Sequence, residues 1–202
     1  MNNSPLKDIT GIILAGGKSL RYGRDKAFEP FDGVPLIKRV INAMEEVFEE
    51  VIIIANEPDK YSCLKHEVYE DVVKGIGPIA GILTGIMHIK NEAGFFVACD
   101  MPFLIPAFIR HIANIRNGFD IVIPRVGKNI EPLHAVYTKD CLPFIKRSIW
   151  QRRFSIRSFF PQVSVRYVEE DEIRRYDPEL SFLVNINKPE DIRRIRGRCL
   201  NL

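Results

Sequence analysis

Short apolar segments rich in β-branched residues alternate along this chain with segments whose apolar residues recur at helical spacing. The candidate strands are Ile9–Leu14, Val51–Ala55, Glu67–Tyr69, Phe95–Cys99, Asp120–Pro124, His134–Tyr137, Val163–Val168 and Phe182–Val184. The candidate helices are Pro35–Val47, Ile79–Ile89 opened by Pro78, Pro106–Ile115, Lys139–Ser148 and Pro189–Ile195. This alternation predicts an α/β fold, a Rossmann-like, doubly wound, mainly parallel sheet with helices on both faces.

Composition narrows the class of protein further. A chain of 202 residues with 46% hydrophobic residues has enough material for one substantial core, so we expect a single domain over residues 1–202. The net charge of +3 is too mild to indicate binding to nucleic acid or a membrane surface, but it suits a protein that handles small anions. The four cysteines lack C-x-x-C spacing, and no apolar run approaches about 18 residues. We therefore expect a soluble protein of the reducing cytoplasm.

Polar residues follow four of the candidate strands at the point where each strand ends. A glycine-rich loop follows Ile9–Leu14, and Asn56, Asp71 and Asp100 follow or closely follow the next strands. Ligands of doubly wound proteins bind outside the carboxyl ends of the parallel strands. We therefore expect these four polar elements to meet at one edge of the sheet and to form the functional site.

The glycine-rich loop between the first strand and Lys26 has the composition of a phosphate-binding site. Its glycines are Gly16, Gly17 and Gly23, and its cations are Lys18, Arg21, Arg24 and Lys26. Glycines leave backbone N–H groups uncovered to converge on phosphate oxygens, and the cations neutralise the phosphate charge. The alternative is a plain strand-to-helix connection, in which Lys26 pairs with the neighbouring Asp25.

Two common phosphate-binding motifs do not fit. A P-loop counted from Gly11 places Gly17 where the motif requires lysine, and its spacer would consist largely of buried strand residues. The stretch Gly75–Ala80 matches the G-x-G-x-x-A dinucleotide fingerprint formally. However, it does not directly follow an apolar strand, and no acidic residue closes a second strand at the expected distance. A Rossmann dehydrogenase is therefore disfavoured.

Asp100 is the leading candidate for a metal ligand. It ends an apolar strand and precedes Met101 and Pro102, so the chain turns where the carboxylate appears. Such an aspartate either caps a turn or holds a magnesium ion, which takes one or two carboxylates and fills its remaining positions with phosphate and water. Asp71 is a weaker candidate because Glu70 adjoins it, and the alternative there is ordinary surface charge.

The remaining charged residues carry weaker signals. The four histidines share no metal-ligand spacing and pair with no nucleophile motif, so we interpret them as surface or core residues. The basic run 193–198 is typical of a solvated helix end. Arg152, Arg153 and Arg157 accompany phenylalanines in a predicted amphipathic helix, where they either bind a second anion or serve packing.

Taken together, these segments resemble the molybdenum cofactor guanylyltransferases, a group within the nucleotidyltransferases that share a pyrophosphorylase-like signature. The resemblance spans nearly the whole chain. The matching stretches are Leu14–Lys26 to L-A-G-G-x-x-x-R-M-G-x-x-D-K, Gly77–Gly81 to G-P-L-A-G, Cys99–Phe103 to C-D-x-P-[FY], Pro132–Tyr137, and Val184–Glu190 to V-N-x-N-x-P-E. The first stretch is the most specific, although Tyr22 replaces the usual methionine.

The resemblance implies a nucleotide-diphospho-sugar transferase-like domain that transfers GMP from GTP to the phosphate of molybdopterin. The implied catalytic residues are Lys26, Arg21 and Asp100, with Asp100 as the ligand of Mg²⁺. The expected GTP contacts are Leu14, Ala15, Gly16, Gly17, Lys26, Asn56, Asp71, Gly77 and Asp100, among which Asn56 and Asp71 serve guanine and ribose. The expected molybdopterin contacts are Arg157, Asn185 and Asn187.

Several alternatives remain open from the sequence. A nucleotidyltransferase of the same fold could use CTP, or could act on a sugar or polyol phosphate. A nucleotide-binding protein without transferase activity could instead deliver cofactor to a molybdoenzyme. Molybdoenzymes and other cofactor-biosynthesis proteins are the expected macromolecular partners, whereas nucleic acid and membranes are not expected.

Overall fold

A computed structural model describes residues 4–15, 26–186 and 191 of the chain. Its main sheet has eight strands, in the order β10-β7-β9-β6-β1-β4-β5, with β8 paired to β7. The strands are β1 (Thr10–Leu14), β4 (Val51–Ile54), β5 (Glu67–Tyr69), β6 (Ala93–Ala98), β7 (Ile121–Val126), β8 (Asn129–Ile130), β9 (His134–Thr138) and β10 (Val165–Glu169). The pairs β6–β1, β1–β4, β4–β5 and β7–β10 are parallel, whereas β9 runs antiparallel to β6 and β7. The mainly parallel sheet predicted from the sequence is confirmed.

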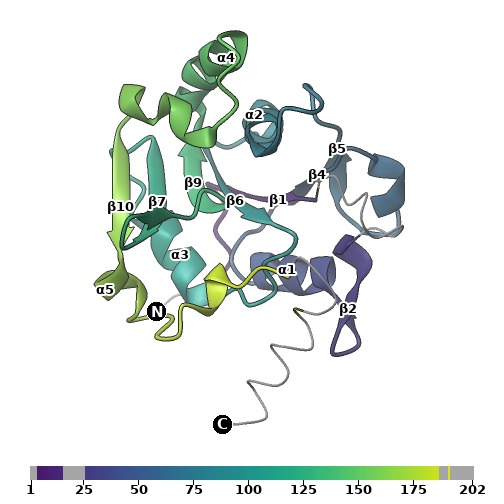
Figure 1. Cartoon of the computed structure of the whole chain (residues 1–202). Coiled ribbons are helices and arrows are strands. Elements are labelled where there is room, and N and C mark those ends of the chain that lie inside the picture. The colour runs from purple at the N-terminus through teal and green to yellow at the C-terminus, as the bar shows by residue number, and fades with distance from the viewer. Residues whose placement is uncertain (1–3, 16–25, 187–190, 192–202) are drawn as a thin grey trace.

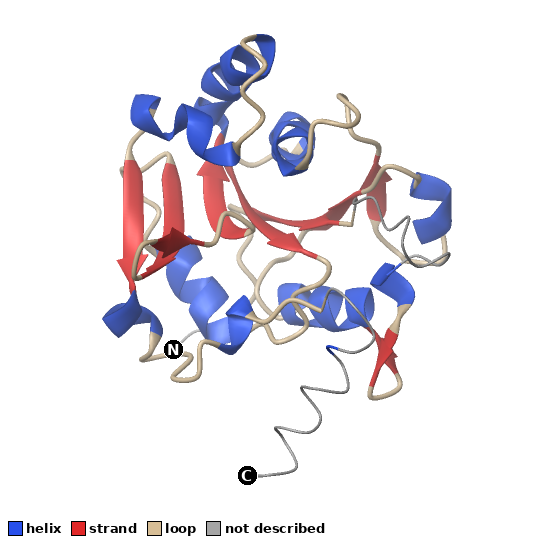
Figure 2. Cartoon of the chain, in the orientation of Figure 1, coloured by secondary structure: helices blue, strands red, loops and turns tan. Residues whose placement is uncertain are grey.

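Helices cover both faces of this sheet (Figures 1 and 2). The α-helices are α1 (Leu36–Glu45), α2 (Pro78–His88), α3 (Pro106–Asn114), α4 (Leu142–Trp150) and α5 (Glu170–Ile173). Helices α1 and α3 lie below the sheet in the view of Figure 1, and α2 and α4 lie above it. Short 3₁₀ segments complete the described chain: η1 (Lys26–Phe28), η2 (Pro58–Tyr61), η3 (Lys139–Cys141), η4 (Ile156–Gln162) and η5 (Ser181–Leu183).

The two faces bury separate apolar cores, because successive side chains of a strand point to opposite sides. In β1, Ile13 packs into the core shared with α1 and α3, whereas Ile12 and Leu14 pack into the core shared with α2 and α4. Helices cover both faces of the sheet at β1, so all residues of the strand are buried. This burial fixes the register of the strand whose end leads into the glycine-rich loop.

Helix α2 approaches the sheet closely through two glycines. A Cβ atom at Gly81 would lie 3.0 Å from Leu14 Cδ1, and one at Gly85 would lie 2.5 Å from Phe96 Cε1. Any side chain at either position would therefore push the helix away from β1 and β6. The small residues hold the beginning of α2 close to the carboxyl end of β1.

Two sequence-based expectations about secondary structure are wrong. The run Phe182–Val184 is not a strand, because Leu180 is left-handed, with φ of 54°, and Ser181–Leu183 form a 3₁₀ turn that buries Phe182. The amphipathic helix expected from Arg152 to Phe160 is also absent. Arg152 has φ of 59° and ends α4, and the chain becomes helical again only in η4.

Other expectations are confirmed, extended or left open. The helices expected after Pro35, Pro78 and Pro106 are present, although α1 begins at Leu36 because Pro35 belongs to a short hairpin. That hairpin, formed by β2 (Pro30–Phe31) and β3 (Val34–Pro35), was not predicted. The helix expected over 189–195 lies outside the described residues, except for Asp191. None of the helices in the described part of the chain combines the length and apolar character needed to span a bilayer.

Candidate active site

The carboxyl ends of four parallel strands meet at one edge of the sheet. Strands β6, β1, β4 and β5 are consecutive neighbours, and their backbone pairing continues just beyond the strand ends. The amide of Cys99 donates to Leu14 O over 3.0 Å, and that of Ala15 donates to Ile54 O over 2.8 Å. The amide of Ala55 donates to Tyr69 O over 2.9 Å. The expectation that these strand ends converge is confirmed, and the described residues that directly follow them lie at this edge.

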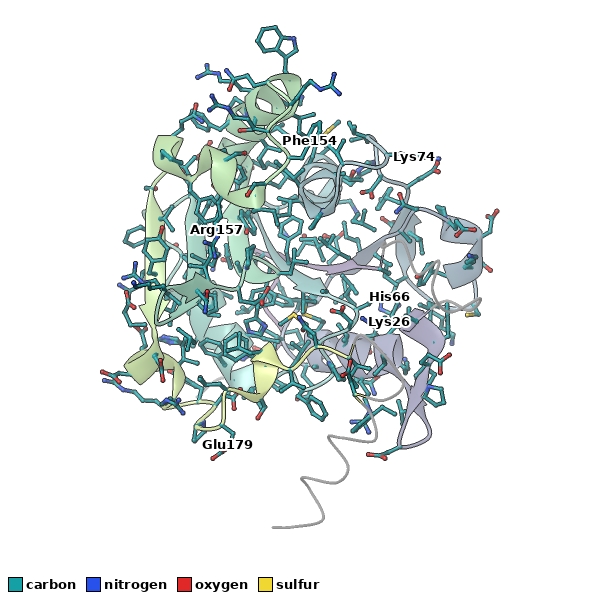
Figure 3. The ribbon with its side chains drawn as sticks, viewed as in Figure 1. Lys26, His66, Lys74, Phe154, Arg157 and Glu179 are labelled. Atoms are coloured by element: carbon teal, nitrogen blue, oxygen red, sulfur yellow. The ribbon has the colours of Figure 1, made fainter. Side chains whose placement is uncertain are left out.

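Lys26 and Asp100 form an ion pair at this edge. The Lys26 ammonium donates to Asp100 Oδ2 over 2.8 Å, and the two side chains are 15% and 23% exposed. Lys26 opens η1, whose Phe28 ring packs 5.3 Å from the ring of Tyr61. The buried Tyr61 hydroxyl in turn donates to Ala15 O over 2.8 Å. The lysine is therefore tied to the end of β1, and Figure 3 shows where it lies.

Lys26 and Asp100 are both placed so that each could exchange its contact with the other for a contact with a ligand. Both side chains keep some contact with solvent, so an anionic ligand can reach the ammonium without unfolding the site. The described residues offer Asp100 Oδ1 no hydrogen bond, which leaves this oxygen available to a cation. A lysine that meets phosphate and a carboxylate that meets a metal ion are the two charges that a metal–triphosphate complex requires.

Asp71 is half-buried behind the end of β5. The Thr84 hydroxyl of α2 donates to Asp71 Oδ1 over 3.4 Å. Thr84 Oγ1 also accepts a 3.0 Å hydrogen bond from the Val72 amide. Burial raises the pKa of Asp71, the charge of Glu70 raises it further, and the Thr84 hydroxyl opposes the shift. A partly desolvated carboxylate of this kind is a strong acceptor for the hydroxyl or N–H groups of a ligand.

The segment that carries Asn185 is joined to Asp100 by the backbone. The Ile186 amide donates to Asp100 O over 2.9 Å, across 86 positions of sequence. Ile186 itself is 2% exposed and packs with Phe31 and Leu36, whereas Asn185 is exposed. This contact holds an exposed asparagine close to the strand end that carries the candidate metal ligand.

The other expected ligand residues are distributed unevenly. Asn56 is exposed directly after β4, and Gly77 is exposed at the start of α2. Gly77 has φ of 81°, and a Cβ there would meet nothing within 4 Å, so its conformation rather than lack of space requires glycine. Arg157 is exposed in η4. Figure 3 shows it on the other side of the view from Lys26, so the structure does not bring these two cations together.

Several expected site residues lie outside the described residues. These are Gly16, Gly17, Lys18, Arg21, Gly23 and Arg24 of the glycine-rich loop, together with Asn187. Leu14 and Ala15, which lead into the loop, are buried, and their carbonyl groups are occupied by Cys99 and Tyr61. The roles of the loop residues remain sequence-based predictions.

The histidines and cysteines provide neither a metal centre nor a nucleophile pair in the part of the chain that the structure describes. No group of three or more His, Cys, Asp or Glu residues there could hold a metal by itself. Cys63, Cys99 and Cys141 form no disulfide bonds with one another. His134 is fully buried among Phe95, Phe108 and Phe182, so it belongs to the core.

Glu131 is a site residue that the sequence analysis missed. Burial raises the pKa of this half-buried carboxyl group, the Leu133 amide lowers it, and the negative charge of Asp100 raises it. The two carboxylates therefore interact electrostatically, although they are 31 positions apart in the sequence. The pairing of β6 with β9 would have indicated this proximity, but it cannot be read from the residues of either strand alone.

Comparison with known proteins places this geometry in context. Residues 11–165 match the MobA-like NTP transferase domain family. A probable molybdenum cofactor guanylyltransferase of Pelotomaculum thermopropionicum is 37% identical over 95% of this chain and 94% of its own length. A molybdenum cofactor guanylyltransferase of Desulfosudis oleivorans is 38% identical over 91% of this chain and 92% of its own length. The crystal structure of molybdopterin-guanine dinucleotide biosynthesis protein A from Archaeoglobus fulgidus superimposes with a TM-score of 0.82, at 27% identity, over 96% of this chain and all of that one.

Proposed function

The chain belongs to the MobA-like NTP transferase domain family, and from this premise we propose that it is a molybdenum cofactor guanylyltransferase. The reaction transfers GMP from GTP to the phosphate of molybdopterin and releases pyrophosphate. The observation that carries the proposal is the Lys26–Asp100 pair at the carboxyl edge of the sheet, in a chain that matches two such guanylyltransferases along more than nine-tenths of its length.

The reaction needs no nucleophile from the protein. An oxygen of the molybdopterin phosphate attacks the α-phosphorus of GTP, the bond from that phosphorus to the bridging oxygen breaks, and the electron pair leaves with pyrophosphate. The acceptor is already an anion, so the protein has to align two negatively charged groups and offset their repulsion. In this proposal Lys26 leaves Asp100 for the phosphates and, with Arg21, stabilises the charge that grows on pyrophosphate.

Asp100 fits the role of a magnesium ligand in this proposal. Mg²⁺ prefers oxygen ligands and commonly uses one or two carboxylates together with phosphate oxygens, so a site with few carboxylates suits it. When bound, the ion would screen the phosphate charges and polarise the α-phosphoryl group. Asp100 would hold it from a rigid strand end, and transfer of Lys26 to the phosphates would free Oδ2 for the same purpose.

The proposal divides the remaining contacts between the two substrates. The backbone at Leu14, Ala15, Gly16 and Gly17, with Gly77 at the start of α2, would surround the nucleotide. Asn56 and the half-buried Asp71 would bind guanine and ribose. Asn185 and Asn187 would contact molybdopterin beside Asp100, and Arg157, which lies apart, would contact a more distant part of that substrate.

A pyrophosphate-release assay tests the proposed function. The purified protein is mixed with Mg²⁺, molybdopterin and each nucleoside triphosphate in turn, and GTP is expected to give the highest turnover. Lys7→Ala is a matched control for Lys26→Ala, because Lys7 is an exposed lysine before the start of β1, at the opposite edge. Preference for CTP, or turnover only with a sugar or polyol phosphate, would change the substrates. Binding of GTP without release of pyrophosphate would favour a protein that delivers cofactor to molybdoenzymes.

A further inference from the structure

Glu131 is held firmly in the turn before β9. Its amide donates to Pro124 O in β7 over 3.1 Å, and its Oε1 accepts a 3.1 Å hydrogen bond from the Leu133 amide. The following carbonyl, that of Pro132, accepts a 2.9 Å hydrogen bond from the buried Tyr137 hydroxyl. The second carboxylate oxygen of Glu131, Oε2, has no hydrogen-bond partner among the residues that the structure describes. The carboxylate is therefore fixed in place with one oxygen uncommitted.

The topology of the sheet places this carboxylate at the same edge as Asp100. Strands β6 and β9 are antiparallel, and their last pair at this end is Val97 with His134. Asp100 follows β6 and Glu131 precedes β9, each three residues beyond this pair, so both lie in the turns at the same end of two neighbouring strands. The negative charge of Asp100 also raises the pKa of Glu131, as expected for two carboxylates at the same edge.

The charges of this group do not suit a bare triphosphate. Lys26 carries one positive charge, whereas Asp100 and Glu131 together carry two negative charges, so the three side chains sum to −1. A surplus carboxylate repels phosphate oxygens when no cation lies between them. A divalent cation between the carboxylates and the phosphates turns this repulsion into attraction.

Resting on the proposed function, we propose that Glu131 is a positioning residue for the divalent cation that Asp100 holds. It acts through Asp100 and the cation: its fixed negative charge at the end of the β6–β9 ladder strengthens binding of the metal–nucleotide complex and weakens binding of the metal-free nucleotide. Carboxylates that surround a metal ligand commonly have effects of this kind.

The alternative role of Glu131 is purely structural, because its Oε1 caps the turn at Leu133. Glu131→Gln separates the two roles. A glutamine at this position keeps an oxygen acceptor for the Leu133 amide and nearly the same shape, and it removes only the charge. The matched control is Glu179→Gln, which removes the charge of an exposed glutamate far from Lys26 in Figure 3.

Calorimetric titration with GTP tests the proposal, once with saturating Mn²⁺ and once with a chelator. In Glu131→Gln, the dissociation constant for the manganese–GTP complex is expected to rise about 10-fold or more, while the constant for metal-free GTP falls. Loss of a structural contact would weaken both. An unchanged affinity for the manganese complex, or a change of both constants in the same direction, overturns the inference.

Asp100→Asn separates failure of this inference from failure of the metal site itself. If Asp100→Asn loses the manganese-dependent gain in GTP affinity and Glu131→Gln keeps it, Glu131 has no role toward the cation and the proposed metal site stands. If both variants keep the full gain, the proposed metal role of Asp100 fails together with the inference. Glu179→Gln is expected to match the unmodified protein in both titrations.

Discussion

Replacing His134 with phenylalanine is expected to make the protein less sensitive to acid. The imidazole is fully buried, stacked on Phe108 at 5.3 Å and set edge-on against Phe95 at 5.1 Å. Neither ring nitrogen has a hydrogen-bond partner among the described residues. Burial in this apolar cluster lowers the pKa of His134 from 6.5 to about 3, so the folded protein keeps the ring neutral.

The size of the effect follows from proton linkage. The unfolded chain takes up a proton at this residue as the pH falls below about 6.5, whereas the folded protein does not until about pH 3. The unfolded state is therefore favoured increasingly as the pH falls through this window. For a histidine with these two pKa values, the free energy of unfolding drops by about 2 kcal/mol between pH 7 and pH 5. The result barely depends on the folded pKa, provided that it lies well below 5.

Urea denaturation followed by far-ultraviolet circular dichroism measures this difference. The gap in unfolding free energy between His134→Phe and the unmodified protein is expected to widen by about 2 kcal/mol in favour of the variant between pH 7 and pH 5. Groups that titrate in both proteins cancel in the comparison. His134→Leu provides a second variant if the larger ring distorts the core. Parallel stability curves for the unmodified protein and both variants would show that His134 is protonated in the folded state.

Three further changes probe the site and its support. Lys26→Ala is expected to reduce turnover about 10²–10³-fold with an unchanged circular dichroism spectrum, and near-normal pyrophosphate release would exclude Lys26 from the catalytic site. Gly16→Ala is expected to raise the Michaelis constant for GTP more than that for CTP, with a difference equivalent to about 1–3 kcal/mol of binding free energy. Equal effects on both nucleotides would place guanine selection elsewhere. Gly85→Ala puts a methyl group 2.5 Å from Phe96 Cε1. The overpacking cost of about 1–3 kcal/mol should exceed the gain of up to about 1 kcal/mol in helix propensity, so the variant is expected to be less stable. A urea midpoint equal to or above that of the unmodified protein would contradict this expectation.

The sequence predicted the parts of the fold that local patterns determine. The buried strands of the sheet and helices α1 to α4 carry their own apolar periodicity and were found. Phe182 illustrates why one strand was predicted wrongly: a short apolar run fits a strand equally well, but here tertiary contacts with Phe108 and His134 decide its conformation. Arg152 ends α4 in the left-handed conformation that glycine usually occupies, so no local signal marked the end of the helix.

Some residues of the candidate site could likewise be predicted from local patterns, and others could not. Lys26 and Asp100 follow strongly apolar strands or a glycine-rich loop, so sequence reasoning could select them before their contact was known. Asn185 was reached only through the family resemblance, because the hydrogen bond from Ile186 to Asp100 joins segments that are distant in the sequence. Glu131 was missed because its position depends on an antiparallel pairing within a mainly parallel sheet.

The bond between Ile186 and Asp100 also has a consequence for biosynthesis. Every strand of the described sheet has been translated once β10 is complete, but the partner of the Asp100 carbonyl is translated later. A product that stops shortly after β10 would contain all the strands and yet lack the Asn185 segment at the strand end. Such truncated chains would also lose the contacts of Phe182 with Phe108 and His134, so they are expected to be both inactive and less stable than complete molecules.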